Sequence, residues 1–285
     1  MTRKSLIHFA LVSVLWGIPY LLMKVAVEDF PPAAVVAGRT LIGASILIPI
    51  AIYRKKFGGA VLGFKYVAFY ALMEMIGPWI LITTAEQKID SGLAGLLVST
   101  VPIFATIITS LRGDHSVWQF KRIFGIVVGF VGLILVVGIE SLSGNSDPLS
   151  IAMVIVASMG YAYAVIMVTT NLPLVDGIAI NGLAMAITTV FWAPVAIAQW
   201  PSSISMNSAL SLIALGIFST AIAFILFFKV IAEIGPARSS LVTYLNTAIA
   251  VLLGVIILRE PLTVGIVVGL PLVLVGSYLA SRKTA

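Results

Sequence analysis

Long runs of apolar residues dominate the sequence, and short polar segments separate them. A helix needs about 20 mostly apolar residues to cross a bilayer. Strands of a membrane barrel instead alternate apolar and polar positions over about 10 residues, and the runs here are continuous. The pattern therefore predicts an all-α membrane protein with ten spans, at residues 5–26, 33–53, 64–83, 92–111, 122–139, 149–170, 178–198, 209–229, 237–257 and 262–281.

Composition supports a lipid environment. Hydrophobic residues make up 60% of the chain and charged residues 10%, with a mean hydropathy of +1.15, whereas soluble domains are about a quarter charged. The first apolar run follows Arg3 and Lys4 as in a secretory signal, but it is too long and no cleavage pattern follows it. We therefore expect it to be the first span. The chain has no cysteine, which excludes disulfides and thiol chemistry.

The formal charge of +6 is distributed as a topology signal. With the N-terminus inside, the inner segments hold 13 of the 17 basic residues, the outer segments hold Lys88 and Arg259, and Lys24 and Arg39 lie within spans. This bias predicts that both termini are cytoplasmic. Nucleic acid is not expected as a partner, and the lipid bilayer is.

A repeat divides the chain into halves, residues 1–142 and 143–285. The pentapeptide GIVVG occurs at 125–129 and again at 265–269, near the start of the last span of each half. Five spans per half make the second half enter from the opposite side, which gives an inverted repeat with substrate bound near the midplane. Glycines on one face of spans 5 and 10 predict close helix packing, so we expect these spans to be scaffold.

Glu74 is the candidate of greatest chemical interest, because a carboxylate near the middle of a span is costly and indicates function. It is expected to bind a substrate amino group, carry a proton or form a structural ion pair with Arg39, and the sequence does not choose among these. Lys24, near the outer end of span 1, is either a member of a gate or a side chain that snorkels to water.

Prolines inside spans predict helix breaks, which free carbonyl groups. We expect breaks at five positions and favour a role in the pathway for Pro19 and Pro78. The five are Pro19, Pro78, Pro102, Pro194 and Pro271.

Deep aromatic and small polar residues suit a pocket for planar or apolar side chains. For any one ring, packing against lipid is the alternative. The deep aromatic residues are Trp16, Tyr20, Trp79, Tyr161, Tyr163, Phe224 and Tyr244, and the polar candidates are Ser99, Thr100, Ser219, Thr220, Thr243 and Asn246.

Five segments resemble the drug/metabolite transporter superfamily, specifically its EamA family. They are Trp16–Lys24 with Trp-Gly-Ile-Pro, Pro31-Pro32 followed by Arg39, Val101-Pro102-Ile103, Ile234-Gly235-Pro236-Ala237, and Leu258-Arg259-Glu260. The resemblance covers nearly the whole chain and implies ten helices in two inverted five-helix repeats around a central cavity. Asn246 stands where the family often has proline, so the break in span 4 is expected to lack a counterpart in span 9.

By overall similarity the chain is most like the bacterial aromatic amino acid exporters of this family. The resemblance implies an inner-membrane transporter that exports aromatic and other apolar amino acids by alternating access, with threonine and methionine as further candidate substrates. Efflux of aromatic or cationic drugs is the alternative, and a membrane scaffold is the non-transport alternative. An enzyme is not expected, because two distant histidines, no cysteine and no nucleophile motif supply neither a metal site nor an acid–base pair. No cofactor is expected, and a monomer is plausible.

Overall fold

The computed structural model describes residues 3–113, 119–142, 147–235, 239 and 241–281, and within them every regular element is a helix. Pro236 and Ala237 of the fourth family-like segment, and the basic residues Arg238, Arg282 and Lys283, lie outside the described residues.

The first half of the chain contains five expected spans and one short extra helix. Its elements are α1 (Arg3–Ala26), α2 (Pro32–Tyr53), α3 (Phe57–Leu62), α4 (Phe64–Ala71), η1 (Leu72–Ile76), α5 (Gly77–Ala85), α6 (Ser91–Val98), α7 (Val101–Leu111) and α8 (Phe120–Leu142). The span expected at 64–83 is thus built from α4, η1 and α5, and the span expected at 92–111 from α6 and α7.

The second half follows the same order of long helices. Its elements are α9 (Pro148–Asn171), α10 (Gly177–Ala198), α11 (Met206–Ala214), η3 (Leu215–Ile222), α12 (Ala223–Ile234), α14 (Val242–Ile257) and α15 (Val264–Ser281). Three of these helices have an N-cap side chain that accepts a hydrogen bond from a backbone N–H group: Asp147 caps α9, Asp176 caps α10 and Ser205 caps α11.

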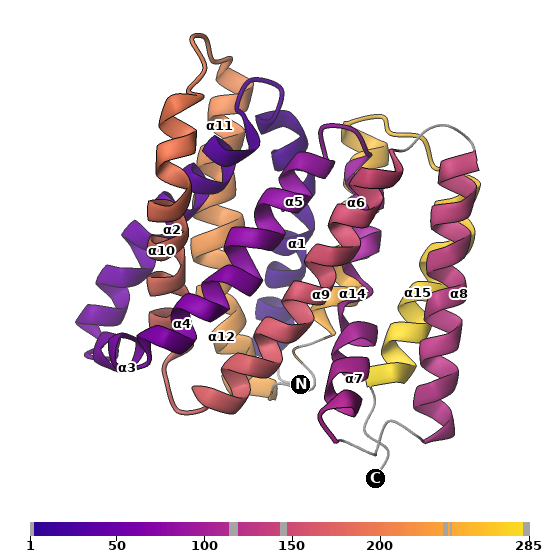
Figure 1. Ribbon diagram of the computed structural model, residues 1–285, viewed down its shortest axis with the longest axis horizontal. Coiled ribbons are helices and arrows are strands. Elements are labelled where there is room, and N and C mark those ends of the chain that lie inside the picture. The colour runs from indigo at the N-terminus through magenta and orange to yellow at the C-terminus, as the bar shows by residue number, and fades with distance from the viewer. Residues whose placement is uncertain (1–2, 114–118, 143–146, 236–238, 240, 282–285) are drawn as a thin grey trace.

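The chain is a multi-pass membrane protein. Seven helical segments in the described residues are long and apolar enough to cross a bilayer, and α14 and α15 supply two shorter apolar helices. The helix α8 adds a further 23 residues at the place of the expected fifth span. Figure 1 shows the helices running up and down between the same two ends of the molecule.

Only two of the expected proline breaks occur. Pro102 is the second residue of α7, directly after a break at Ser99 and Thr100, and Pro78 is the second residue of α5, which follows the π-helical η1. Pro19, Pro194 and Pro271 lie inside continuous α-helices, so the breaks expected there are wrong. A proline removes one hydrogen bond, and a long helix held by its neighbours tolerates this loss. The helix α14 is continuous through Asn246, which confirms that the break in span 4 has no counterpart in span 9.

Two π-helical segments interrupt equivalent spans of the two halves. η1 lies in the third span and η3 in the eighth, and each joins two α-helices. In η3 the Thr220 hydroxyl bonds the carbonyl five residues back, at Leu215, over 2.8 Å. Widened turns of this kind leave backbone groups free and occur often at functional sites. No proline or glycine pattern in the sequence marks η3.

The glycine faces of α8 and α15 pack directly on each other, which confirms the predicted packing of these two helices. A Cβ on Gly125 would lie 2.5 Å from the Ala280 nitrogen, and one on Gly132 would lie 2.8 Å from the Val273 nitrogen. A Cβ on Gly276 would overlap the backbone of Gly129, and one on Gly269 would overlap the Val136 side chain. The two helices are therefore antiparallel, and Figure 1 shows them as a pair at one edge of the bundle.

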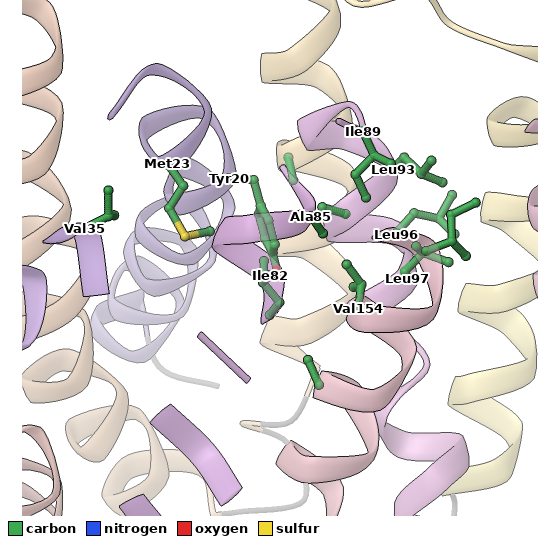
Figure 2. Packing of buried hydrophobic residues seen from close by; sticks show 14 of the residues in the cluster. Tyr20, Met23, Val35, Ile82, Ala85, Ile89, Leu93, Leu96, Leu97 and Val154 are labelled. Carbon is green, nitrogen blue, oxygen red and sulfur yellow. The ribbon is translucent and has the colours of Figure 1, made fainter. Parts of the chain in front are cut away.

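A hydrophobic core at one end of the bundle packs helices of both halves together, and α8 and α15 contribute Leu133, Val136, Ile266 and Val273 to it. Figure 2 shows Tyr20 and Met23 of α1 facing Ile82 and Ala85 of α5, with leucines of α6 and Val154 of α9 beyond them. The start of α1 and the turn between α2 and α3 lie at the opposite end, which Figure 1 shows at the bottom.

Candidate functional site

A buried arginine lies at the centre of the candidate site. The guanidinium carbon of Arg39, on α2, lies 3.7 Å from the centroid of the Trp79 ring on α5. Its Nε and Nη2 donate to the Thr220 hydroxyl of η3 over 3.3 and 3.2 Å. Arg39 is 6% exposed, and within the described part of the chain it makes no ion pair. A buried, unpaired cation is costly, so this arginine is a strong candidate to bind an anion.

Tyr161 connects the arginine to an acid. Its hydroxyl accepts a hydrogen bond from the Trp79 side chain, and it interacts electrostatically with Arg39, Tyr20 and Glu74. We call Tyr20, Arg39, Trp79, Tyr161 and Thr220 the Arg39 cluster. Its members come from α1, α2, α5, α9 and η3, so both halves of the chain build it.

Glu74 lies in η1 and has one buried carboxylate oxygen that no described residue hydrogen-bonds. It does not form the ion pair with Arg39 that the sequence offered as one interpretation, because the only ion pairs among the described residues are His8–Glu233 and Lys88–Asp147. Glu74, which is half-buried, and Arg39 therefore both interact with Tyr161 but form no ion pair with each other.

Lys24 does not extend to water as a snorkelling side chain. Its ammonium donates to the carbonyls of Glu86 and Ile89, each over 2.7 Å. It thereby satisfies carbonyls at the C-terminal end of α5, where the helix dipole favours a positive charge. These two hydrogen bonds connect α1 to the turn between α5 and α6.

The other expected site residues divide into groups. Trp16 packs on Phe224 and Phe227 of α12, with ring centroids 5.6 and 4.5 Å apart. The Ser99 hydroxyl bonds the Leu96 carbonyl over 2.6 Å at the break before Pro102.

Two expected pocket tyrosines are turned to other neighbours. The Tyr163 hydroxyl accepts from Arg112 over 3.0 Å, at the end of α7. The Tyr244 ring lies 6.2 Å from that of Tyr278 on α15. Asn246, on the same helix as Tyr244, has its backbone carbonyl at the close crossing of α14 with Gly17. The structure thus brings together Tyr20, Arg39 and Trp79, and it places Tyr163 and Tyr244 elsewhere.

The sequence does not distinguish three residues at the site from their neighbours: Tyr161, Thr220 and Glu86. Tyr161 and Tyr163 are two positions apart on one helix and so point to different sides, and hydropathy does not tell which side faces inward. Thr220 was one of many small polar residues. Glu86 follows the third span directly and has the sequence context of a loop acid, yet its side chain is fully buried.

Comparisons with known proteins agree with this architecture. The model of the EamA-like transporter family matches residues 3–138 and again residues 148–282. "Uncharacterized transporter YoaV" of Bacillus subtilis is 27% identical, with 97% of this chain and 96% of that protein covered. "Uncharacterized inner membrane transporter YedA" of Escherichia coli K12 is 26% identical, with coverages of 95% and 90%.

A solved crystal structure has the same fold. Its TM-score is 0.67 at 15% identity, and the alignment covers 98% of this chain and 97% of that one. The names of the relatives are those of transporters rather than enzymes. With the family model matching nearly all of the chain in two successive segments, the protein is a membrane transporter that belongs to the EamA-like transporter family.

Proposed function

We propose that this transporter exports amino acids with aromatic and other apolar side chains by alternating access. The observation that carries the proposal is that Arg39 and Glu74 both interact with Tyr161 but form no ion pair with each other. A zwitterion bound between them supplies a carboxylate to the guanidinium and an ammonium to the acid, so that each buried charge gains the partner it lacks in the empty protein.

The aromatic residues around these charges favour a large, apolar substrate side chain. Tyr20 and Trp79 are buried in the Arg39 cluster, and Trp16 and Phe224 lie on the neighbouring faces of α1 and α12. Stacking and burial against such rings stabilise planar side chains by about 1–3 kcal/mol each. Methionine and threonine are expected as weaker substrates.

The proposed architecture is an inverted repeat of five spans, residues 1–142 and 143–285, around a central substrate pathway. Two successive matches to one family model support it, as do the π segments in the third and eighth spans. The glycine contacts add a pairwise symmetry: Gly129 meets Gly276, and Gly269, at the repeat position of Gly129, meets Val136.

We propose that the protein lies in the bacterial inner membrane with both termini in the cytoplasm. The ends of α2 and α7 carry Arg54, Lys55, Lys56 and Arg112, and the excess of basic residues is expected on the cytoplasmic side. YedA carries the words "inner membrane" in its name. Fusing a reporter after Asn145 and after Ala285 tests this topology, since reports from the same side would contradict five spans per half.

Counterflow into proteoliposomes tests the substrate. Labelled tryptophan should accumulate against unlabelled tryptophan, and competition should need both charges. Tryptamine lacks the carboxylate and indole-3-propionate lacks the ammonium, so both should compete at least tenfold more weakly than tryptophan. Strong competition by tryptamine alone would favour the alternative, efflux of cationic compounds, which the buried positive charge of Arg39 disfavours.

A further inference from the structure

The least expected charged group in the molecule is Glu86. It lies one residue after α5, where the chain turns towards α6, and its side chain is fully buried. Neither of its carboxylate oxygens has a hydrogen-bond partner among the described residues. The neighbouring residues Tyr20, Ile82, Ala85 and Ile89 belong to the hydrophobic core seen in Figure 2.

Positive groups lie near this carboxyl but are bound to other atoms. The Lys24 ammonium donates to the carbonyls of residues 86 and 89 rather than to the side chain. Arg39 of α2 interacts with Glu86 electrostatically, while its guanidinium is stacked on Trp79 and bonded to Thr220. Neither cation therefore neutralises Glu86 through a direct contact.

The remaining titratable neighbours do not neutralise it either. Tyr20 faces it from α1, and Tyr161 of α9 lies beyond Tyr20 and Arg39. Glu260, from the connection between α14 and α15, is a second acid, and its oxygens accept from the Ser91 and Gly92 backbone over 2.7 and 3.1 Å. Lys88, in the same turn, is directed towards Asp147 at 3.9 Å.

A metal cation does not fit this place. Sodium and calcium ions need several oxygen ligands. The nearby carbonyls are occupied by Lys24 and the Glu260 oxygens by the start of α6. A proton needs only one oxygen, and it removes the charge that makes burial costly.

We propose that Glu86 is a proton-binding site of the transport cycle: it takes up a proton when the α5–α6 end of the bundle closes and releases it to water when that end opens. In the closed form the O–H bond keeps the carboxyl neutral in the apolar core. In the open form the hydrated carboxylate attracts the Lys24 ammonium away from the carbonyls of residues 86 and 89, which loosens the turn. The inference rests on the proposed alternating access but not on the identity of the substrate.

The pH dependence follows from this scheme. Burial raises the pKa of the Glu86 carboxyl well above its usual value in the closed form, and hydration in the open form restores the usual value. The closed form binds the proton more tightly, so low pH favours closure. Raising the pH favours opening, and the shift occurs in the range between the pKa of Glu86 in the open form and its pKa in the closed form.

Cysteine labelling without substrate measures the opening directly, because the chain has no cysteine of its own. Ala85→Cys places one thiol beside Glu86 in the buried core. The protein, in lipid nanodiscs, is treated with a hydrophilic maleimide between about pH 5 and about pH 9, on both sides of the usual range of carboxyl pKa values. The thiolate fraction itself rises with pH, so each rate is divided by that of Ser202→Cys, an exposed position.

The normalised labelling should rise at least fivefold from acid to alkaline pH. Adding Glu86→Gln should hold it low at all pH values, because the amide is neutral and nearly the same shape. Glu233→Gln, which neutralises the acid paired with His8 on α12, should keep the full pH response. If Glu86→Gln does not fold, Glu86→Asp must still show a pH response, and its loss there contradicts the proposal.

A flat profile in the parent protein, or an unchanged profile after Glu86→Gln, overturns the proposal. So does labelling that depends on sodium rather than on pH, because it identifies a metal cation as the ligand. Since no substrate is present, these outcomes are independent of the tryptophan counterflow experiment.

Discussion

The guanidinium of Arg39 lies over the indole of Trp79, with its central carbon 3.7 Å from the ring centroid. The contact joins α2 to α5, and Thr220 of η3 holds the other side of the guanidinium. Because Arg39 makes no ion pair within the described residues, the direct contacts of its guanidinium are with a ring and a hydroxyl, which a substrate carboxylate can supplement.

Arg39→Lys should weaken tryptophan transport. A lysine keeps the charge but loses the planar stacking and the paired donors, and a desolvated cation–π contact contributes about 2 kcal/mol. We expect the apparent KM to rise roughly 10- to 30-fold, measured by counterflow. Arg112→Lys is the matched control. Arg112 also lies over an aromatic ring, that of Tyr163 at 4.8 Å, but it does so at the end of α7. Equal losses in both variants would contradict a site at Arg39.

Removing single hydroxyl groups should distinguish two tyrosines of α9. Tyr161→Phe removes the acceptor for the Trp79 side chain beside Arg39 and Glu74, and the lost hydrogen bond of about 1 kcal/mol should lower transport about fivefold. Tyr163→Phe removes the acceptor for Arg112 and should leave transport within twofold. The reverse order would move the substrate site towards the end of α7.

Glu74→Gln should reduce transport of tryptophan while the protein still folds. The acid has no ion-pair partner in the described structure, so the neutral amide relieves a buried charge instead of leaving one behind. We expect at least a tenfold loss of counterflow at an unchanged melting temperature. Unfolding, or full transport, would show that Glu74 has a purely structural role.

Widening the contact between α8 and α15 should destabilise the fold. Gly129→Leu and Gly269→Leu place large side chains where even a Cβ overlaps neighbouring atoms, and overpacking costs about 1–3 kcal/mol. The yield of monodisperse protein and its melting temperature should both fall. Gly58→Leu is the control, because nothing lies within 4 Å of a Cβ at that position.

Acid should loosen the connection between α10 and α11. Ser205 donates its backbone N–H to Asp29 over 2.9 Å, and hydrogen bonds from Ser205 hold the pKa of Asp29 below its usual range. The charged form is favoured in the folded protein, so the bond contributes stability above the usual Asp pKa of about 3.9 and loses it as the pH falls through the lowered value. The protection of the Ser205 amide, measured as its hydrogen-exchange rate relative to the intrinsic rate at each pH, should fall in acid.

Asp29→Asn should show low protection of the Ser205 amide at neutral pH already, and the protection should change little further in acid. Asp147→Asn is the control, because Asp147 caps α9 through Ser150 instead. An acid response of Ser205 that survives in Asp29→Asn would assign it to another group.

The sequence predicted the helices better than it predicted their contacts. Long apolar runs place the spans, and the glycine faces at 125–132 and 265–276 predicted the packing of α8 and α15, because small residues in lipid serve mainly close approach. Hydropathy does not fix the rotation of a helix that is apolar all round. The sequence therefore did not separate Tyr161, which neighbours Arg39, from Tyr163, which accepts from Arg112.

Charged residues were the hardest to place from the sequence. Glu86 and Lys24 lie at the ends of expected spans, where water is the simplest partner. Their positions depend on how tightly the turn between α5 and α6 packs on α1, which is a tertiary property. The π segment η3 was equally unforeseen, because a single glycine in an apolar run, here Gly216 packed against Ile42 of α2, does not indicate a π-helix.

The contact between the glycine faces of α8 and α15, here called the seam, joins the two halves of the chain independently of the peptide bond between them. Each of these helices ends its own half, yet each packs its glycine face against the other half, backbone against backbone. A polypeptide cut between residues 142 and 147 should therefore still assemble when the two fragments are produced together, because the seam and the packing of α2 on α10 join the fragments without the connecting peptide bond. Neither fragment should be stable alone, since each would expose to lipid a face shaped to receive a partner helix.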